Sequence, residues 1–302
     1  MRTIGAVVLA GELRYSEVPP PPAREDEALV KVLSAALTPL DVAAVRGYAP
    51  YAYGKVVGSA GLVRVLDLGY RVTNLVVGES AVVSPKCFIK LALVKNGVMA
   101  DQASIESSCL EPVPQSLTSS LGLYISLLAH LPLVVSSLSG SSVLVAGCGY
   151  EAVALIKLIK DEVKTEAICV SEFGLRRISR LGVRAYLRDR VGGEFDVVYV
   201  SSLDPYVNNL AISKCMDSLY ISPLVPEYFV TIGSNLRKVM VLSRAKPNIA
   251  EALSIARKVG SEVGNMFKAV DNLKAVVESV KYHTHIAYVP PSDSDKTQFG
   301  QR

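Results

Sequence analysis

The residues best placed to do chemistry form a short glycine-containing loop near the middle of the chain. The loop reads Gly147-Cys148-Gly149-Tyr150-Glu151-Ala152 after an apolar stretch, and it has the form G-x-G-x-x-A. In this motif the first glycine permits a tight turn, the second lets the backbone approach a pyrophosphate, and a small last residue lets a helix pack closely on a strand. The sequence therefore predicts a dinucleotide-binding loop with cofactor contacts at Gly147, Cys148, Gly149, Tyr150 and Glu151.

Two side chains of this loop leave a second interpretation open. Glu151 places a carboxylate near the expected phosphates, which it would repel unless it points away. Tyr150 is large for a loop that admits a ligand. A Rossmann-type domain that has lost its ligand is therefore the alternative.

The choice between NAD and NADP depends on the end of the next strand, where the chain reads Ser171-Glu172. An acidic residue there binds the ribose 2′-hydroxyl of NAD, whereas a nearby arginine in its absence suits the 2′-phosphate of NADP. If Ser171 holds the position, Arg176 and Arg177 supply positive charge, and this arrangement, with NADP, is our prediction. If Glu172 holds it, NAD is favoured. The two arginines also fit a solvated helix face.

Serines end two later apolar stretches, at Ser201 and at Ser222. Ligands of open parallel sheets bind at the carboxyl ends of the strands, so we predict cofactor contacts at both serines. The alternative is that they are ordinary strand-end residues.

The elements that must position these residues change character near Pro114. Before it, short strands such as Ala28–Leu37 alternate with glycine-rich turns, which is typical of a barrel-like β domain. After it, apolar strands such as Ser142–Ala146 and Phe195–Val200 alternate with helices, which indicates right-handed βαβ units on a parallel sheet. We therefore expect an α/β protein with a β-barrel domain and a doubly wound parallel sheet.

Composition narrows the class of protein. The chain has 302 residues, half of them apolar, which suffices for about two domains and excludes a disordered chain. The net charge of +4 is mild and the basic residues are scattered, so we expect no nucleic-acid partner. Prolines, serines and His130 interrupt the uncharged segment 112–150, so we expect no membrane span.

The cysteines bear on the compartment. They are Cys87, Cys109, Cys148, Cys169 and Cys215. Their number is odd, none form a C-x-x-C pair, and the N-terminus lacks the apolar region of a signal peptide. We therefore expect a cytoplasmic protein with reduced cysteines.

Taken in order, several loose motifs resemble the medium-chain dehydrogenase/reductase superfamily, which includes alcohol dehydrogenase-like and quinone oxidoreductase-like proteins. The motifs are Glu17-Val-Pro-Pro-Pro, Thr38-Pro-Leu-Asp41, Arg46-Gly47, Gly58-Ser-Ala-Gly61, Val77-Gly-Glu-Ser-Ala-Val-Val83, the Gly147 loop, Leu181-Gly182, Phe195-Asp-Val-Val198 and Ala287-Tyr-Val-Pro. The resemblance covers nearly the full chain. It implies a GroES-like catalytic domain formed by residues 1–124 and 245–302, a Rossmann domain over residues 125–244, and a homodimer.

By the same resemblance, the ligands of the zinc-dependent members are missing. Thr38 stands where those proteins carry Cys, and Ser59 stands where they carry the His of Gly-His-Glu. The four-cysteine structural zinc loop is also absent after Ser84. Threonine and serine are poor zinc ligands, and the histidines at 130, 283 and 285 fit structural roles, so we expect no metal.

Without a metal, alcohol oxidation loses charge stabilisation, whereas reduction of a quinone or an activated carbonyl needs a hydride and a hydrogen-bond donor for the oxyanion. Thr38 and Tyr48 are the predicted catalytic donors. Ser126 matches a cofactor-lining threonine of the relatives and is predicted to contact the nicotinamide.

Two functions stay open. One is a zinc-independent NAD(P)H oxidoreductase acting on a quinone-like or activated carbonyl small molecule. The other is a non-catalytic relative that binds a nucleotide or acts as an interaction or regulatory subunit.

Overall fold

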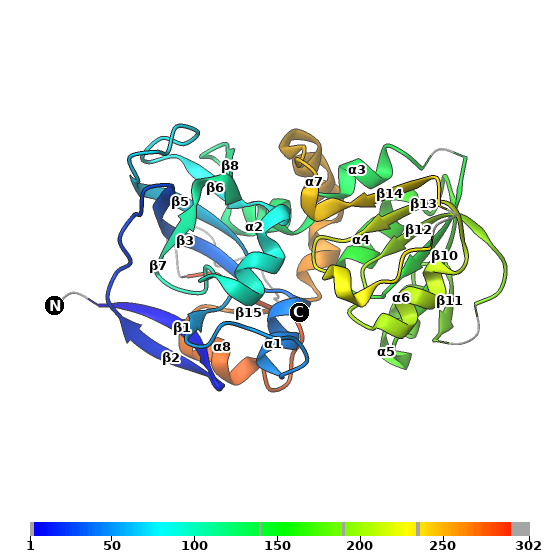
Figure 1. The fold of residues 1–302 in the computed structure, drawn as a ribbon, viewed down its shortest axis with the longest axis horizontal. Helices are drawn as coiled ribbons and strands as arrows, with labels where there is room; N and C mark the ends of the chain where they lie inside the picture. The colour runs from blue at the N-terminus through cyan, green and yellow to red at the C-terminus, as the bar shows by residue number, and fades with distance from the viewer. Residues whose placement is uncertain (1–2, 139, 189–190, 234–235, 291–302) are drawn as a thin grey trace. The chain divides into compact units, whose positions relative to one another are not determined.

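The computed structural model of the chain describes residues 3–138, 140–188, 191–233 and 236–290. These residues divide into two compact units, one with the residues up to 127 and from 264 onward, the other with residues 128–263 (Figure 1). The second unit thus extends beyond the predicted boundary at residue 244 and takes in nearly all of helix α7 (Ile249–Gly264). A side-chain pair between Lys157 and Glu262 of α7 holds this helix within the second unit.

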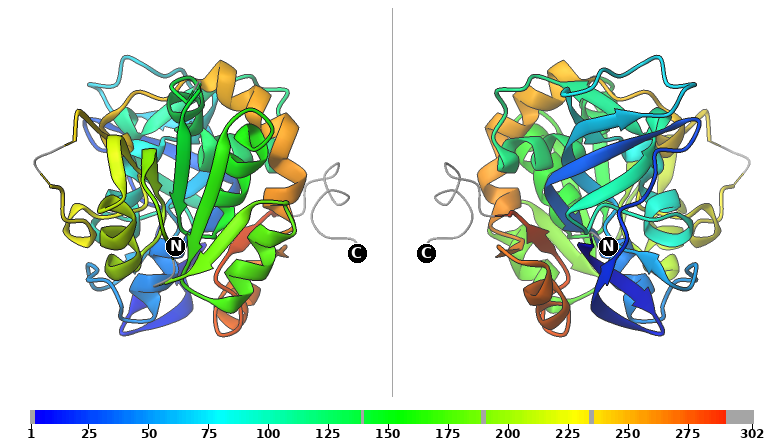
Figure 2. Two further views of the ribbon diagram at one scale, coloured as in Figure 1. Left: turned by 90° about the vertical axis from the view of Figure 1, so that its right-hand side faces the viewer. Right: turned by 90° about the vertical axis from the view of Figure 1, so that its left-hand side faces the viewer.

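The first unit is built mainly on antiparallel strands. Its strands are β1 (Ile4–Ala10), β2 (Glu12–Val18), β3 (Glu27–Leu37), β4 (Lys55–Val56), β5 (Ala60–Leu68), β6 (Ser80–Val83), β7 (Gln102–Glu106), β8 (Leu110–Val113), β15 (Lys268–Val270) and β16 (Ile286–Tyr288). They form a sheet of order β2-β1-β4 and a larger sheet of order β15-β16-β3-β5-β6-β8, to which β7 adds by pairing with β3. The hairpin of β1 and β2 is the dark blue element in Figure 2. Because β16 pairs with β3, the C-terminal part of the chain returns to the larger sheet of the first unit.

Short helices complete the first unit: α1 (Pro39–Val45), α2 (Ser119–Leu128), α8 (Leu273–Ser279), two 3-10 turns (Pro85–Cys87 and Ser107–Cys109) and one π-helical turn (Lys90–Val94). Helix α1 begins at a capping box, in which Thr38 and Asp41 bond to each other's backbone amides. Pro39, in the first turn, lacks an amide hydrogen that would have no helical partner there.

The second unit is a parallel six-stranded sheet of order β11-β10-β9-β12-β13-β14. Its strands are β9 (Ser142–Ala146), β10 (Lys164–Cys169), β11 (Arg184–Leu187), β12 (Phe195–Val200), β13 (Cys215–Ile221) and β14 (Lys238–Val241). Its helices besides α7 are α3 (Leu131–Val135), α4 (Tyr150–Ile159), α5 (Glu172–Ser179), α6 (Pro205–Ile212) and the 3-10 turns Glu227–Phe229 and Leu242–Arg244; the left view of Figure 2 shows them around the sheet. The strand order reverses between β9 and β12, and such a point is where open α/β sheets bind ligands.

The parallel sheet forms because its strands are apolar on both faces. The side chains of Leu144, Ile168, Val198 and Leu219 belong to one buried cluster and come from four neighbouring strands. Val- and Leu-rich strands of this kind are stable only when helices cover both faces. In the described ranges, no helix is both long and apolar enough to cross a bilayer.

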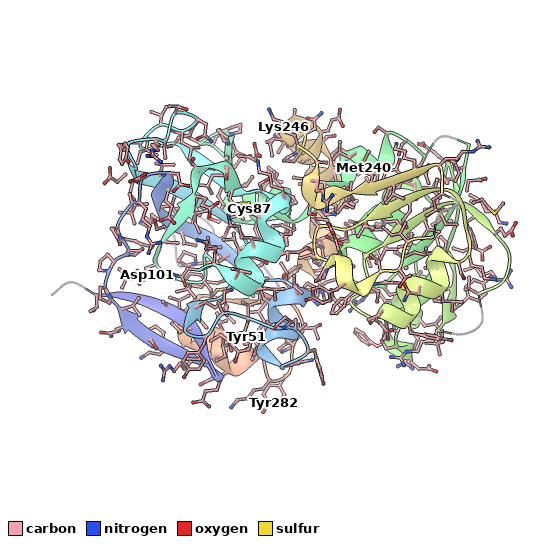
Figure 3. The ribbon with its side chains drawn as sticks, viewed as in Figure 1. Tyr51, Cys87, Asp101, Met240, Lys246 and Tyr282 are labelled. Atoms are coloured by element: carbon pink, nitrogen blue, oxygen red, sulfur yellow. A yellow bond between two sulfur atoms is a disulfide. The ribbon has the colours of Figure 1, made fainter. Side chains whose placement is uncertain are left out.

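The expectation of reduced cysteines is wrong for four of the five. Cys87 pairs with Cys109 in the first unit, and Cys148 pairs with Cys169 in the second, with Cα–Cα distances of 5.7 and 5.4 Å; Cys87 is labelled in Figure 3. Cys215 is free. Both pairs join residues from separate elements that the fold brings together, so spacing along the sequence could not reveal them. Because disulfides are rare in the cytosol of most organisms, the cysteines no longer support a cytoplasmic location.

We predict that Cys87→Ser/Cys109→Ser lowers the free energy of unfolding of the first unit by about 3 kcal/mol, because the disulfide closes a loop of 22 residues. Guanidinium unfolding in the absence of reductant measures the change, and Cys215→Ser is the matched control because this thiol is unpaired. An unfolding midpoint equal to that of the control variant would contradict the prediction.

Candidate functional site

The predicted phosphate loop lies between β9 and α4. Gly147 has φ +119°, which only glycine adopts readily, and its amide donates to the Ile168 carbonyl at 2.9 Å. A Cβ atom at this position would lie 2.7 Å from Ser201 Oγ. Gly149 is the N-cap of α4, and among the described residues no side chain caps this end of the helix by a hydrogen bond. The loop therefore turns tightly and leaves the first amides of α4 available to an anion.

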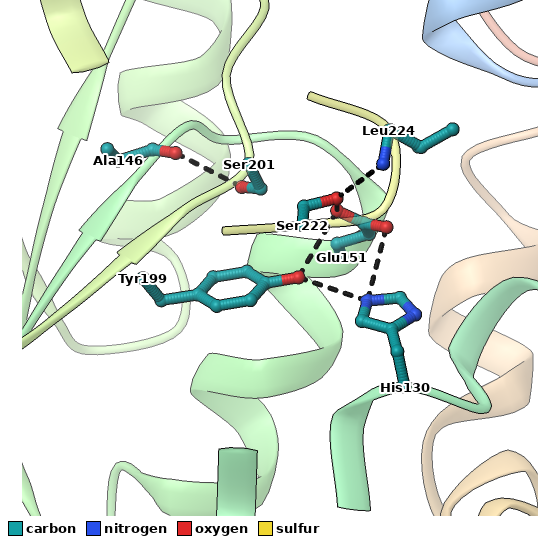
Figure 4. Close-up of polar contacts among 7 residues, drawn as sticks. All are labelled: His130, Ala146, Glu151, Tyr199, Ser201, Ser222 and Leu224. Carbon is teal, nitrogen blue, oxygen red and sulfur yellow. Dashed lines mark hydrogen bonds and ion pairs between the residues drawn. The ribbon is translucent and has the colours of Figure 1, made fainter. Parts of the chain in front are cut away.

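Ser201, the residue after β12, supports this loop. Its hydroxyl donates to the Ala146 carbonyl at 3.1 Å (Figure 4). Its predicted cofactor contact stays a prediction, because the structure gives the hydroxyl this internal partner.

The loop after β10 brings one arginine to the phosphate loop. Ser171 is the N-cap of α5 and accepts from the Gly174 amide at 3.2 Å, and Glu172 follows it, exposed. Arg177 Nη1 donates to the Cys148 carbonyl at 3.3 Å, and its guanidinium lies 4.6 Å from the centre of the Phe173 ring.

Burial lowers the pKa of Arg177 from its usual value. Arg176, on the same helix, is exposed. The structure therefore separates the two predicted arginines, since only Arg177 contacts the loop.

Glu151 does not face outward. Its side chain is 3% exposed and lies in a buried polar cluster with His130, Tyr199 and Ser222 (Figure 4). Glu151 Oε2 accepts from Ser222 Oγ at 2.6 Å and from the Tyr199 hydroxyl at 3.2 Å. His130 Nε2 lies 3.2 Å from Glu151 Oε1 and 3.0 Å from the Tyr199 hydroxyl. Ser222 Oγ also accepts from the Leu224 amide at 3.1 Å.

Burial makes this cluster neutral in weakly acidic solution. Removal from water raises the pKa of Glu151 to about 7, although its hydrogen bonds from Ser222 and Tyr199 act in the opposite direction. Burial also lowers the pKa of His130 to about 3. The protonated Glu151 carboxyl can therefore donate a hydrogen bond to Nε2 of the neutral His130 imidazole. The repulsion expected between Glu151 and a phosphate is thereby reduced, because the carboxyl is protonated and turned inward.

The cluster also occupies residues that the sequence assigned to the cofactor. Ser222 and Glu151 bond to each other, and Tyr150 is 1% exposed. The cofactor contacts of Ser222, Glu151 and Tyr150 stay predictions, and each of these side chains also has a structural role in the buried interior.

In the first unit, Thr38 belongs to a second buried network centred on Asp41. Asp41 Oδ2 accepts from the hydroxyls of Thr38 and Ser59, at 2.8 and 2.6 Å, and from the amides of the same two residues. Asp41 Oδ1 accepts from the Gly58 amide at 3.1 Å. Thr38 Oγ1 also lies 3.0 Å from Ser59 Oγ. Thr38 and Ser59, which the resemblance aligns with zinc ligands, are thus hydrogen bonded to a shared carboxylate.

The other predicted residues of this unit differ in exposure. Ser126 is fully buried; its hydroxyl donates to the Val83 carbonyl at 2.7 Å and accepts from the Gly61 amide at 3.2 Å. Tyr48, by contrast, is 77% exposed. Across the described ranges, no group of three or more His, Cys, Asp or Glu side chains is placed to hold a metal ion.

Comparisons with known proteins show which solved structures share this fold. No protein-family model and no curated protein matches the sequence. Among solved structures, the alcohol dehydrogenase of Thermus sp. ATN1 aligns with a TM-score of 0.73 and 15% identity over 95% of this chain and 100% of its own. Benzyl alcohol dehydrogenase of Acinetobacter calcoaceticus aligns with a TM-score of 0.72 and 15% identity over 96% of this chain and 100% of its own. An alcohol dehydrogenase of Escherichia coli complexed with NADH gives 0.71 and 15% over 95% and 99%.

The fold is that of the alcohol dehydrogenases. The predicted fold class is confirmed, and so is the resemblance to medium-chain dehydrogenases at the level of the fold.

Sequence reasoning missed the cluster around Glu151. Tyr199 lies in an otherwise apolar strand and was part of no motif, and His130 fitted a structural role. The one available signal was a set of polar residues inside apolar segments, because a buried carboxyl needs hydrogen-bonding partners. The Cys148–Cys169 pair had no comparable signal.

The cluster predicts opposite effects of pH in two variants. The contribution of Glu151 to stability is fully present below its unfolded pKa of 4.5 and is lost as the pH rises through about 7. The contribution of His130 is fully present above its unfolded pKa of 6.5 and is lost as the pH falls towards about 3. Between pH 4.5 and 6.5 the two slopes oppose each other.

We therefore expect Glu151→Gln to make the free energy of unfolding rise with pH across this window, and His130→Gln to make it fall. Each change amounts to roughly 3 kcal/mol, since one pH unit corresponds to about 1.4 kcal/mol for one proton. Urea unfolding at pH 4.5, 5.5 and 6.5 measures it, with the double variant as the control that removes both slopes. Equal slopes in the two single variants would show that the pair does not titrate in this way.

Proposed function

We propose that the chain is a zinc-independent oxidoreductase that binds a nicotinamide dinucleotide, preferentially NADP, at the Gly147 loop. The observation that carries this proposal is the loop itself, in which a glycine of positive φ and a helix N-terminus without a side-chain cap among the described residues follow a strand beside the reversal of strand order. A Cβ at Gly147 would lie 2.7 Å from Ser201 Oγ, so this turn requires glycine, and Glu151 at the start of α4 bonds internally rather than facing the loop. The NADH in the Escherichia coli structure supports a nicotinamide cofactor as such, whereas the preference for NADP rests on residues of this chain.

The preference for NADP rests on Arg177 and Ser171. An uncharged residue, Ser171, caps α5 just after β10, and the guanidinium of Arg177 lies beside the loop. A guanidinium is well suited to a 2′-phosphate. Glu172 at the exposed start of α5 is the residue that would favour NAD instead.

When bound, the nicotinamide would supply a hydride, and the product oxyanion then needs a donor from the chain. The Thr38 hydroxyl already donates to Asp41, so it fits a positioning role better than a donor role. Tyr48 is exposed, and the structure gives its hydroxyl no partner among the described residues. We therefore assign the donor role to Tyr48, with a quinone-like or activated carbonyl compound as substrate.

A second function has its own support. Ser126, Ser222, Glu151 and Thr38 all form internal hydrogen bonds, which leaves few polar groups free for substrate. A protein that binds the nucleotide without turnover, as an interaction or regulatory subunit, would need none of them. We also propose a homodimer formed along β14, which is an edge strand of the parallel sheet with Val239 exposed. Sedimentation tests the dimer.

The cofactor prediction concerns Arg177. Nicotinamide fluorescence should report micromolar binding of NADPH and weaker binding of NADH. Arg177→Ala should weaken NADPH binding about tenfold or more, because a charge-assisted hydrogen bond is worth about 1.5–3 kcal/mol. Arg180→Ala, at the exposed end of the same helix, is the control and should change little. Absence of binding by either nucleotide would reject this function.

The turnover prediction concerns Tyr48. Tyr48→Phe should lower kcat for NADPH-dependent reduction of a quinone or an enone about 100-fold while KM changes little, because the donor acts on charge formed in the transition state. Tyr53→Phe, 78% exposed in the same loop, is the control. The activity should survive a zinc chelator. NADPH binding without turnover of any such substrate would favour the non-catalytic function.

A further inference from the structure

The Cys148–Cys169 disulfide lies within the proposed nucleotide site. Cys148 is the middle residue of Gly147-Cys148-Gly149, and Cys169 is the last residue of β10. The bond therefore joins the phosphate loop to the strand whose following turn carries Ser171.

The same two segments are packed together around this bond. A Cβ atom at Gly174, in the first turn of α5, would lie 2.9 Å from Cys148 Cβ, so α5 starts directly against the disulfide. Arg177, one turn further along α5, donates to the Cys148 carbonyl. The Gly147 amide donates to the Ile168 carbonyl, next to Cys169. The disulfide thus holds the phosphate loop, the end of β10 and Arg177 in one arrangement.

The two sulfurs are unequal. Cys148 is half-buried, directly precedes the N-cap of α4, and has the guanidinium of Arg177 on its carbonyl. A helix N-terminus and a neighbouring arginine both favour a thiolate. Cys169 is fully buried. This is the arrangement of an accessible reactive thiol beside a resolving thiol. Cys87 and Cys109 are both buried, 6% and 1% exposed, so the other disulfide lacks this asymmetry.

We propose that Cys148 and Cys169 form a redox-responsive clamp that sets the affinity of the phosphate loop for the dinucleotide, with the disulfide form binding more tightly. The inference rests on the proposed function, since it concerns the same loop. Without the disulfide the loop has more conformational freedom, which it must lose when the dinucleotide binds. The disulfide removes that freedom beforehand, and preorganisation of this kind increases affinity.

The redox step is thiol–disulfide exchange. A dithiol supplies a thiolate that attacks Cys148 Sγ, the Cys148–Cys169 bond breaks, and the electron pair leaves on Cys169, which takes up a proton. The second thiol of the reductant then displaces Cys148, so that two protein thiols and one cyclic disulfide are formed. A small-molecule disulfide reverses the reaction, with Cys148 as the attacking thiolate.

Linkage makes the effect reciprocal. If the oxidised form binds the nucleotide tenfold more tightly, saturating nucleotide lowers the midpoint potential of the disulfide by about 30 mV. The nucleotide should therefore protect Cys148 from reduction.

The experiment is calorimetric titration of the whole chain with NADP. Four samples are compared: oxidised wild type, wild type reduced by dithiothreitol, Cys148→Ser/Cys169→Ser, and the matched control Cys87→Ser/Cys109→Ser. The control removes a disulfide of nearly the same span, 22 residues against 21. The reduced wild type needs no substitution, so a folding defect in the variants does not block the test. Thiol counting before each titration gives the redox state, since Cys215 alone is free in the oxidised protein.

We expect the dissociation constant to rise about three- to tenfold in reduced wild type and in Cys148→Ser/Cys169→Ser, and to stay unchanged in the control. Equal affinity in all four samples would overturn the clamp and leave the proposed function intact. An equal loss in the control would also overturn it, because the effect would then be general. If none of the four samples binds any of NADP, NADPH and NADH in this assay, the proposed function fails and the clamp fails with it.

Discussion

Burial of the Glu151 carboxyl is the constraint around which the second unit is arranged. A carboxyl removed from water must be neutral or fully hydrogen bonded, because an isolated buried charge is very costly. Glu151 meets this requirement with partners from three separate places: Tyr199 on β12, Ser222 after β13, and His130 before α3. These contacts fix the start of α4 against the ends of two strands. The phosphate loop, which leads into α4, is held in place by the same contacts.

The first unit solves the same problem differently. Asp41 accepts hydrogen bonds from amides and hydroxyls of Thr38 and Ser59 and from the Gly58 amide, so donors surround it. Glu151 receives hydroxyl donors and faces an imidazole, and burial then raises its pKa towards neutrality. Asp41 in the first unit and Glu151 in the second are therefore buried carboxyls that connect segments distant in the sequence.

The parts of the structure that follow from local pattern were predictable from the sequence. The strand-loop-helix around Gly147 and the parallel sheet rest on periodicity and glycine positions, whereas the return of the C-terminal strands to the first unit came from the family resemblance. Contacts between individual side chains of distant segments were not predictable. The bond between Cys148 and Cys169, the inward turn of Glu151 and the contact of Arg177 rather than Arg176 with the loop depend on which elements lie side by side.

The Asp41 network limits what two hydroxyl-bearing positions of the first unit, 38 and 59, can do. A serine or threonine there could have been left as a weak polar group, free to meet a substrate. Instead, Thr38 and Ser59 donate to Asp41 and lie within hydrogen-bonding distance of each other, and burial makes the network costly to open. Both hydroxyls therefore have internal partners in the Asp41 network. For this reason the proposed chemistry is assigned to groups outside that network, namely the exposed Tyr48 and the Gly147 loop, rather than to Thr38.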